Sequence, residues 1–205
     1  MFPSIGEPQT FRAGVKHISR EDPKLRLLVR KHGLIEFAVE SDQFESLVGS
    51  ILSQQLNGAA AKSIFNKLSD ICSQPISAEK LYNMRPSRLR RIGVSPQKID
   101  YLKNLTARVV NGQLDLDGLK HLPDDEIMRI LDDVRGIGPW TAQMFLLFTL
   151  GRTDVLPVGD LGIQVSIRKV YSLRKNPDAK TIMRIARKWH PYCSVAALYL
   201  WREKS

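Results

Sequence analysis

The sequence predicts an all-α fold. Apolar residues recur at helical spacing in one segment after another, and prolines or small polar residues stand where helices would begin. No segment shows the alternation of apolar and polar residues that is typical of a half-buried strand. Because no long linker interrupts the chain, we expect a single domain over residues 1–205. It would consist of two helical lobes around a shared cleft, roughly residues 35–110 plus the termini and residues 111–190.

The first part of the chain contains three predicted helices with one apolar face each, at about residues 21–32, 42–54 and 59–68. Ser41 and Asp42 are a start signal for the second of them. The three alanines at 59–61 would let a neighbouring helix approach closely.

The remaining elements are also predicted to be helical. Asn111 and Gly112 form a stop signal after the fifteen-residue pattern at 96–110, and Pro123 starts the helix that Gly136 ends. Pro139 suits the first turn of the following helix. The predicted ranges are 77–84, 86–91, 96–110, 123–135, 139–150, 161–171, 179–189 and 194–202.

The chain is strongly basic, with 31 Lys and Arg against 21 Asp and Glu and a net charge of +10. This excess favours an anionic partner, nucleic acid first and an acidic membrane surface second. A basic, solvated surface without a partner is the alternative.

The cysteines and the lengths of the apolar runs indicate the cellular compartment of the protein. Cys72 and Cys193 are the only cysteines, and no Cys-x-x-Cys pair exists, which excludes a zinc or iron–sulfur site built on cysteines. We expect two reduced, buried thiols. The N-terminus does not resemble a signal peptide, and no run reaches the roughly 18 apolar residues of a membrane span. We therefore expect an intracellular protein without membrane contact, in the cytoplasm or nucleoid, or in the nucleus of a eukaryote.

A tight turn, Gly136-Ile137-Gly138, joins two predicted helices and suggests a phosphate-binding hairpin. Glycine permits both the turn and a close approach of a phosphate to the backbone. The N–H groups that open the second helix would then face the anion, up to Thr141. Arg135 adds a positive charge beside the turn. A compact helix–helix turn without a ligand is the alternative.

The same hairpin could hold a monovalent cation between its backbone and a phosphate. The candidate ligands are the backbone carbonyls of Asp132, Val134 and Ile137, with Na⁺ or K⁺ as the ion.

Five segments together resemble the helix-hairpin-helix (HhH-GPD) superfamily of DNA glycosylases, and most closely its AlkA-type 3-methyladenine DNA glycosylases. The likeness covers about residues 40–203. Its segments are Phe44–Leu56, Val134–Ala142, Arg152–Pro157, Asp160, and the stretch from Trp189 through Ser194 to Trp201.

The resemblance implies an enzyme that starts base excision repair. It would bind double-stranded DNA containing damaged bases in the cleft, as a monomer, and excise alkylated purines such as 3-methyladenine or 7-methylguanine. Too few residues precede Phe44 for the extra N-terminal β domain of some relatives, which implies the compact form. The four-cysteine loop of the iron–sulfur relatives is missing, so no cluster and no required cofactor are expected.

Two residues carry the implied chemistry. Where strand-cleaving relatives have a lysine, this chain has Trp140, whose indole cannot form a Schiff base. The resemblance therefore implies hydrolysis by water without lyase activity. Asp160 is the implied catalytic residue, since a carboxylate stabilises the positive sugar that forms as the glycosidic bond breaks. A role as helix N-cap is the alternative and is compatible with catalysis.

The base pocket and the residue that fills the gap in the duplex are also implied by resemblance. Trp140, Tyr192 and Met144 are the pocket candidates, although relatives carry aromatics at the position of Met144. The wedge candidates are Gln55 or Leu56 first, then Asn57 and Gln54. The alternatives are core packing for the pocket residues and an ordinary polar helix end for the wedge. Arg168 and Lys169 are further candidates for phosphate contacts.

Two other functions fit parts of the pattern. A non-catalytic protein that binds DNA structures would use the hairpin but would not need Asp160. A glycosylase for another damaged base, with strand cleavage, is disfavoured by Trp140.

Overall fold

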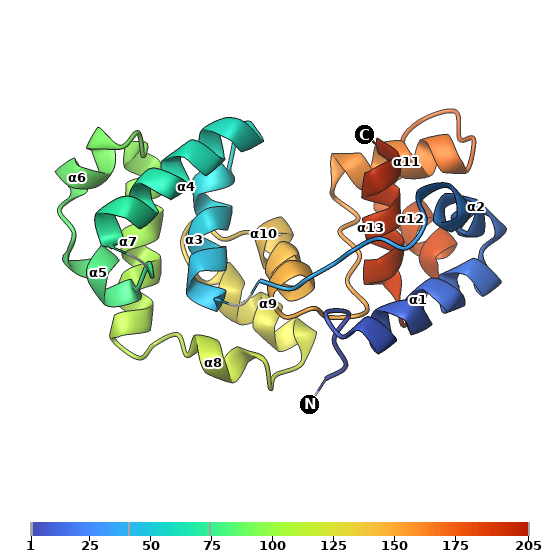
Figure 1. Ribbon diagram of the computed structural model, residues 1–205, viewed down its shortest axis with the longest axis horizontal. Helices are drawn as coiled ribbons and strands as arrows, with labels where there is room; N and C mark the ends of the chain where they lie inside the picture. The colour runs from blue at the N-terminus through green and yellow to red at the C-terminus, as the bar shows by residue number, and fades with distance from the viewer. Residues whose placement is uncertain (1, 41, 74, 205) are drawn as a thin grey trace. The chain divides into compact units, whose positions relative to one another are not determined.

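The computed structural model describes residues 2–40, 42–73 and 75–204, and over these residues the regular structure is helical, which confirms the predicted all-α class (Figure 1). An isolated β-bridge between Ser4 and Arg152 is the only pairing of β type within those ranges.

None of the helices among the described residues is long and apolar enough to cross a membrane. The helices are α1 Pro8–Glu21, α2 Pro23–His32, α3 Gln43–Ser53, α4 Gly58–Cys72, α5 Ala78–Asn83, α6 Pro86–Arg91, α7 Pro96–Val110, α8 Leu116–Leu119, α9 Asp124–Asp132, α10 Pro139–Met144, α11 Leu161–Val170, α12 Ala179–Ala186 and α13 Cys193–Lys204, with a π-helical turn at Phe145–Thr149.

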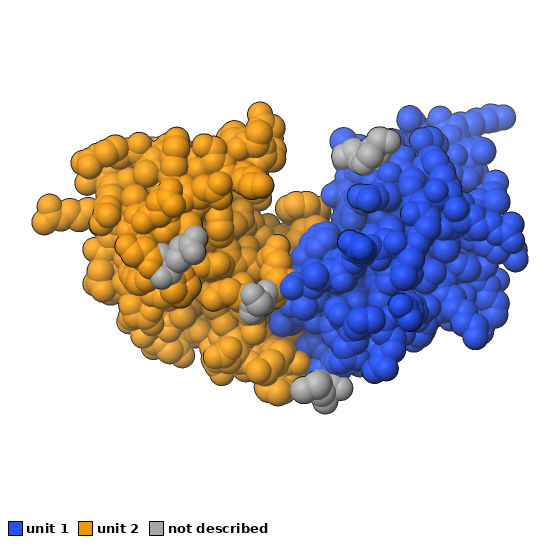
Figure 2. Space-filling model, in the orientation of Figure 1, with its two compact units in different colours: residues 1–39, 146–205 blue, residues 40–145 orange. Residues whose placement is uncertain are grey.

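The chain forms two compact units, shown in blue and orange in Figure 2. The first unit combines Met1–Val39 with Leu146–Ser205 and contains α1, α2 and α11 to α13. The second unit, Glu40–Phe145, contains α3 to α10. Each unit has its own buried core, and the hairpin and Asp160 belong to different units.

The boundary between the units differs from the one expected near residue 110. Residues 111–145 belong with residues 40–110, because α8 packs against α3 and the hairpin is bonded to its own unit. The Arg135 N–H donates to the Asn104 side chain at 3.0 Å, and the Gln54 side-chain amide donates to the Gly136 carbonyl at 2.7 Å. Helical periodicity does not specify which helices pack together, so the sequence could not locate this boundary.

Several helices differ from the predicted ranges. The sequence did not predict α1, in which Phe11 and Ile18 are buried, or the four-residue α8. Pro8 starts α1, but Gly14 in its middle and several charged residues weaken the signal. The predicted helix at 139–150 divides into α10 and the π-helical turn. Ser41, part of the expected start of α3, lies outside the described residues, and Asp42 is the N-cap there.

Glu203 joins three helices of the first unit through its nearly buried carboxylate. Lys169 of α11 lies 2.8 Å from Glu203 Oε1, while Lys31 and His32 of α2 lie 2.7 and 3.0 Å from Oε2. The hydrogen bonds from Lys169, Lys31 and His32 lower the pKa of Glu203 from its ordinary 4.5 to about 2. The charged carboxylate therefore stabilises the packing of α13 against α2 and α11.

Glu203→Gln is expected to lower the free energy of unfolding at pH 7 by about 1.5–3 kcal/mol, since hydrogen bonds to a charged group are lost. Because the folded-state pKa is lowered, the contribution of Glu203 is complete above about pH 4.5 and declines as the pH falls towards 2. Urea unfolding of both proteins at pH 7 and pH 3 measures this. The exposed Asp125, paired with Arg129 at 3.8 Å, provides Asp125→Asn as control. An equal deficit of Glu203→Gln at both pH values would contradict the charge argument.

Candidate functional site

The hairpin at 134–138 is a rigid turn between α9 and α10. The Ile137 N–H donates to the Val134 carbonyl at 2.9 Å, and Ile137 is buried, so its side chain anchors the turn in the core. Gly138 is the N-cap of α10, and its carbonyl accepts from the Ala142 N–H. The N–H groups of the first turn of α10 therefore face away from the helix and are available to an anion.

The two hairpin glycines have different roles. Gly136 has φ +90, and a Cβ there would lie 2.3 Å from the ring of Tyr101, so the fold itself requires glycine. Gly138 has φ −99, and a Cβ there would meet nothing within 4 Å. Its small size leaves open space in front of the first turn of α10.

Two other predicted phosphate contacts differ in their exposure. The Arg135 side chain is exposed beside the turn. Thr141 is buried in the first turn of α10, with 4% of its surface accessible.

The four wedge candidates, residues 54–57, occupy the turn between α3 and α4 and are called the wedge loop below. Gln54 donates to the hairpin at Gly136, and the Asn57 side chain caps α4 by accepting from the Ala60 N–H at 2.8 Å. Gln55, with φ +57, and Leu56, which is 40% exposed, remain at the tip. The structure thus links the wedge loop to the hairpin and places the exposed side chains of Gln55 and Leu56 at the loop tip.

Asp160 is held in a fixed orientation at the start of α11. Its Oδ1 accepts from the Ile163 N–H and from the Trp201 indole N–H, both at 2.9 Å. The N-cap role is therefore confirmed, and it orients the carboxylate that the resemblance implies to be catalytic. Trp201 is a contact that the sequence did not assign to the site, because 41 positions separate it from Asp160 and no local pattern joins them.

Trp201 continues into a row of half-buried aromatic rings. Its ring stacks on Phe148 with centroids 5.8 Å apart, and Phe148 meets Phe37 at 6.1 Å. An aromatic surface therefore lies next to the Asp160 carboxylate within one unit.

The three predicted pocket residues have different surroundings. Trp140 is 46% exposed at the start of α10, so it is not a core residue, whereas Met144 one turn later is buried. The Tyr192 ring packs on α1, where it would lie 2.9 Å from a Cβ at Gly14 and is 5.3 Å from the His17 ring. Tyr192 directly precedes α13, about 13 Å along the axis from Trp201 at about 1.5 Å per residue.

The two basic candidates on α11 also differ. Arg168 is exposed, whereas Lys169 is paired with Glu203 and has a structural role.

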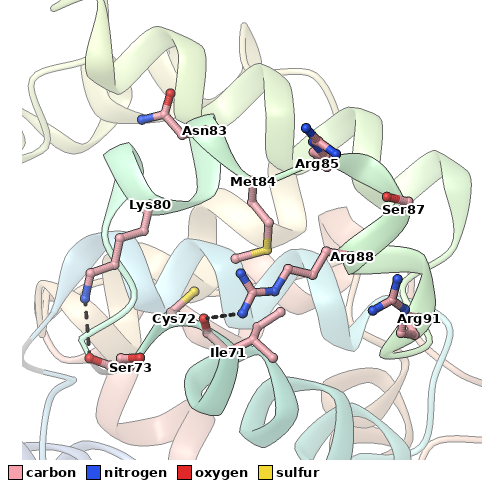
Figure 3. Close-up of a pocket in the computed structure, with 10 residues that line it drawn as sticks. All are labelled: Ile71, Cys72, Ser73, Lys80, Asn83, Met84, Arg85, Ser87, Arg88 and Arg91. Atoms are coloured by element: carbon pink, nitrogen blue, oxygen red, sulfur yellow. Dashed lines mark hydrogen bonds between the residues drawn. The ribbon is translucent and has the colours of Figure 1, made fainter.

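A cavity of about 700 Å³ in the second unit is separate from these residues (Figure 3). It lies at the C-terminal end of α4, about 22 Å along that helix from the wedge loop. Arg88 and Lys80 point into it and donate to the carbonyls of Ile71 and Ser73. Both hydrogen bonds are 3.4 Å long. The two cationic side chains make this a basic surface cavity, and it lies outside the candidate site.

Comparisons with known proteins identify the family to which the chain belongs. Residues 48–191 match the model of the HhH-GPD superfamily base excision DNA repair protein. The chain is 32% identical to DNA-3-methyladenine glycosylase 1 of Schizosaccharomyces pombe, over 80% of this chain and 73% of the relative. It is 30% identical to YfjP of Bacillus subtilis over 87% of its own length and spans 64% of that relative.

A solved structure gives the same result for the fold. The chain resembles the 3-methyladenine DNA glycosylase Mag1 of Schizosaccharomyces pombe, solved in complex with abasic DNA, with a TM-score of 0.84 and 30% identity. The match covers 93% of this chain and 95% of that one. Because the family model covers more than half of the sequence and the fold agrees, the chain belongs to the HhH-GPD superfamily of base excision DNA repair proteins.

Proposed function

We propose that the chain is a monofunctional DNA glycosylase that hydrolytically excises alkylated purines, such as 3-methyladenine or 7-methylguanine, from double-stranded DNA. The observation that carries this proposal is the Asp160 carboxylate, fixed by two donors beside an aromatic surface. The names of the relatives support the same activity. We further propose that the protein acts inside the cell as a monomer and requires no catalytic cofactor.

In the proposed mechanism, the damaged nucleotide first leaves the duplex. As the bond between base and sugar breaks, positive charge develops on the sugar, and the Asp160 carboxylate stabilises it electrostatically. The Ile163 N–H and the Trp201 indole hold the carboxylate plane, so no reorientation is needed when the charge appears. Water then adds to the sugar, and the DNA backbone stays intact.

The aromatic row beside Asp160, with Trp201 and Phe148, is the proposed stacking surface for the extruded base, and Tyr192 remains a proposed pocket residue. An alkylated purine that carries positive charge gains about 0.5–2 kcal/mol over an aromatic face. The exposed indole of Trp140 remains a proposed base-pocket residue, whereas the buried Met144 has a packing role.

The hairpin is proposed to clamp a DNA phosphate. The first-turn N–H groups of α10, the open space at Gly138 and the exposed Arg135 side chain support this role. Na⁺ or K⁺ could bridge the hairpin and the phosphate. Of the three proposed carbonyl ligands, that of Val134 already accepts from the Ile137 N–H and has a second lone pair for the ion.

Leu56 is the proposed wedge, because an exposed apolar side chain at a loop tip can enter the base stack. Leu56→Ala is expected to slow single-turnover base release about 10-fold, since unstacking of a base step costs a few kcal/mol, with an unchanged unfolding midpoint. Gln55→Ala is the matched comparison. A larger loss in Gln55→Ala than in Leu56→Ala would assign the wedge to Gln55. Full activity in both variants would contradict a wedge in this loop.

We expect the protein to excise the base without cleaving the DNA strand. Incubation with alkylated DNA and borohydride is expected to give no covalent protein–DNA adduct, and the product strand is expected to keep an intact abasic site. The reason is that Trp140 has no amine with which to form a Schiff base. Gel analysis of the trapped mixture and of the strand length measures both. A strong adduct would contradict the monofunctional assignment.

A further inference from the structure

Three side chains with metal-binding atoms converge in the first unit, outside the residues assigned above. They are Asp154, in the segment that leads to Asp160, His190, and Cys193 at the start of α13. His190 Nδ1 lies 2.7 Å from Asp154 Oδ2 and 3.6 Å from Cys193 Sγ. One carboxylate oxygen, one imidazole nitrogen and the sulfur all lie within 4.8 Å of one another.

The cluster rests on a rigid frame of buried hydrogen bonds. The Ser194 N–H donates to the Thr153 carbonyl at 3.0 Å, and the Ser194 hydroxyl donates to the Arg152 carbonyl at 2.6 Å. The Val155 N–H donates to the same hydroxyl at 2.9 Å. The Cys193 N–H donates to Asp154 Oδ1 at 3.2 Å. The segment 152–155 and the start of α13 are thus fixed to each other, and the three donor atoms are placed before any ion binds.

From this geometry we propose that Asp154, His190 and Cys193 form a zinc site, with water as the fourth ligand. The missing Cys-x-x-Cys pair excludes a site built on paired cysteines, but not this mixed set with one cysteine. Thiolate, imidazole and carboxylate are the ligands that zinc takes in proteins. A tetrahedral site with ordinary zinc bond lengths separates sulfur and nitrogen by about 3.5 Å, close to the distance observed between Cys193 and His190. Nitrogen and oxygen would be about 3.3 Å apart, so His190 and Asp154 need to separate by roughly 0.6 Å.

The protons and charges of the site balance. On binding, the Cys193 thiol releases its proton to solvent, and His190 binds through the Nδ1 lone pair as the neutral tautomer with its proton on Nε2. One thiolate and one carboxylate then neutralise Zn²⁺. Cys193 is buried, whereas the side chains of His190 and Asp154 are 55% and 34% exposed, so the ion enters from their side.

A bound ion would connect two parts of the proposed active site. Asp154 precedes Asp160 on the same loop, and Cys193 starts the helix that carries Trp201, which donates to Asp160. By joining this loop to α13, zinc would therefore help to hold the Asp160 carboxylate in its orientation. This consequence rests on the proposed function, whereas binding of the ion does not.

Cobalt substitution tests the site directly on the purified chain of residues 1–205. We expect one equivalent of Co²⁺ to produce a sulfur-to-cobalt charge-transfer band in the near ultraviolet, which zinc then abolishes by displacement. Zinc affinity is measured by competition with a chromophoric chelator. Cys193→Ser is expected to lose the band. Both Cys193→Ser and His190→Ala are expected to bind zinc at least about 100-fold more weakly. Loss of a residue that only hydrogen-bonds to a ligand already lowers metal affinity about 10–100-fold, and these two residues are direct ligands.

Cys72→Ser is the matched control, because Cys72 is the other buried, free cysteine and lies in the other unit. This variant is expected to keep the band and the wild-type zinc affinity. Equal zinc affinity in Cys193→Ser and Cys72→Ser, or a cobalt complex without the sulfur band, would overturn the proposal. His190 is exposed, so His190→Ala keeps the test decisive if Cys193→Ser folds poorly. Base-release activity is not part of these readouts, so failure of the zinc site and failure of the glycosylase assignment are distinguishable.

Discussion

Asp160→Asn is expected to slow base release by about 100- to 1,000-fold, the usual cost of removing one electrostatic stabiliser of a transition state. Asparagine keeps the size of the side chain and an oxygen that can accept from Ile163 and Trp201, so the N-cap survives. Only the negative charge near the sugar is lost. Single-turnover release of base from alkylated DNA measures the rate, and fluorescence anisotropy measures DNA binding, which is expected to change little.

Asp178→Asn is the matched control for this result. Asp178 caps α12 by accepting from the Thr181 N–H at 2.8 Å, much as Asp160 caps α11, but it is exposed at the start of a different helix. It is expected to keep full activity. Full activity of Asp160→Asn would contradict the catalytic assignment. A common loss in both variants would assign the effect to capping.

Gly136→Ala is expected to lower the free energy of unfolding by about 2–4 kcal/mol, because it combines an unfavourable positive φ with overpacking. The added methyl group would lie 2.3 Å from the Tyr101 ring, and φ at this position is +90. Denaturant unfolding measures the loss. The displaced turn would also disturb the hydrogen bond from Gln54 of the wedge loop to the Gly136 carbonyl.

Gly138→Ala separates the fold of the hairpin from its function. Its φ of −99 suits alanine, and nothing lies within 4 Å of the new Cβ, so stability is expected to change by less than about 0.5 kcal/mol. The methyl group would occupy the space that a phosphate needs, and DNA affinity is expected to fall. Equal stability losses in both variants would contradict the different roles of the two glycines. Unchanged DNA affinity in Gly138→Ala would contradict the phosphate clamp.

Local patterns predicted the features that depend on neighbouring residues. The helical periodicity, the turn between two helices at 136–138, and Asp160 as an N-cap all follow from short spacings, and the structure confirms them. The family resemblance rested on the same local motifs. Exposure of Trp140 could not be read from its spacing, because a core position and a surface position share that register.

The features that the sequence did not reveal depend on distant contacts. Trp201 reaches Asp160 across 41 positions, and His190 reaches Asp154 across 36. Packing of residues 111–145 with residues 40–110 includes the hydrogen bond between the Arg135 N–H and the Asn104 side chain, which no periodicity indicates. Gly14 lowers the helix signal of α1, yet it is needed there because Tyr192 and Val195 leave no room for a side chain.

Mass analysis of the bases released from alkylated double-stranded DNA tests the central claim most directly. The wild-type chain is expected to release alkylated purines and to leave strands with intact abasic sites, whereas Asp160→Asn is expected to bind the same DNA and release almost none. Binding of the DNA by the wild-type chain without release of any base would contradict the account and would indicate a non-catalytic DNA-binding protein.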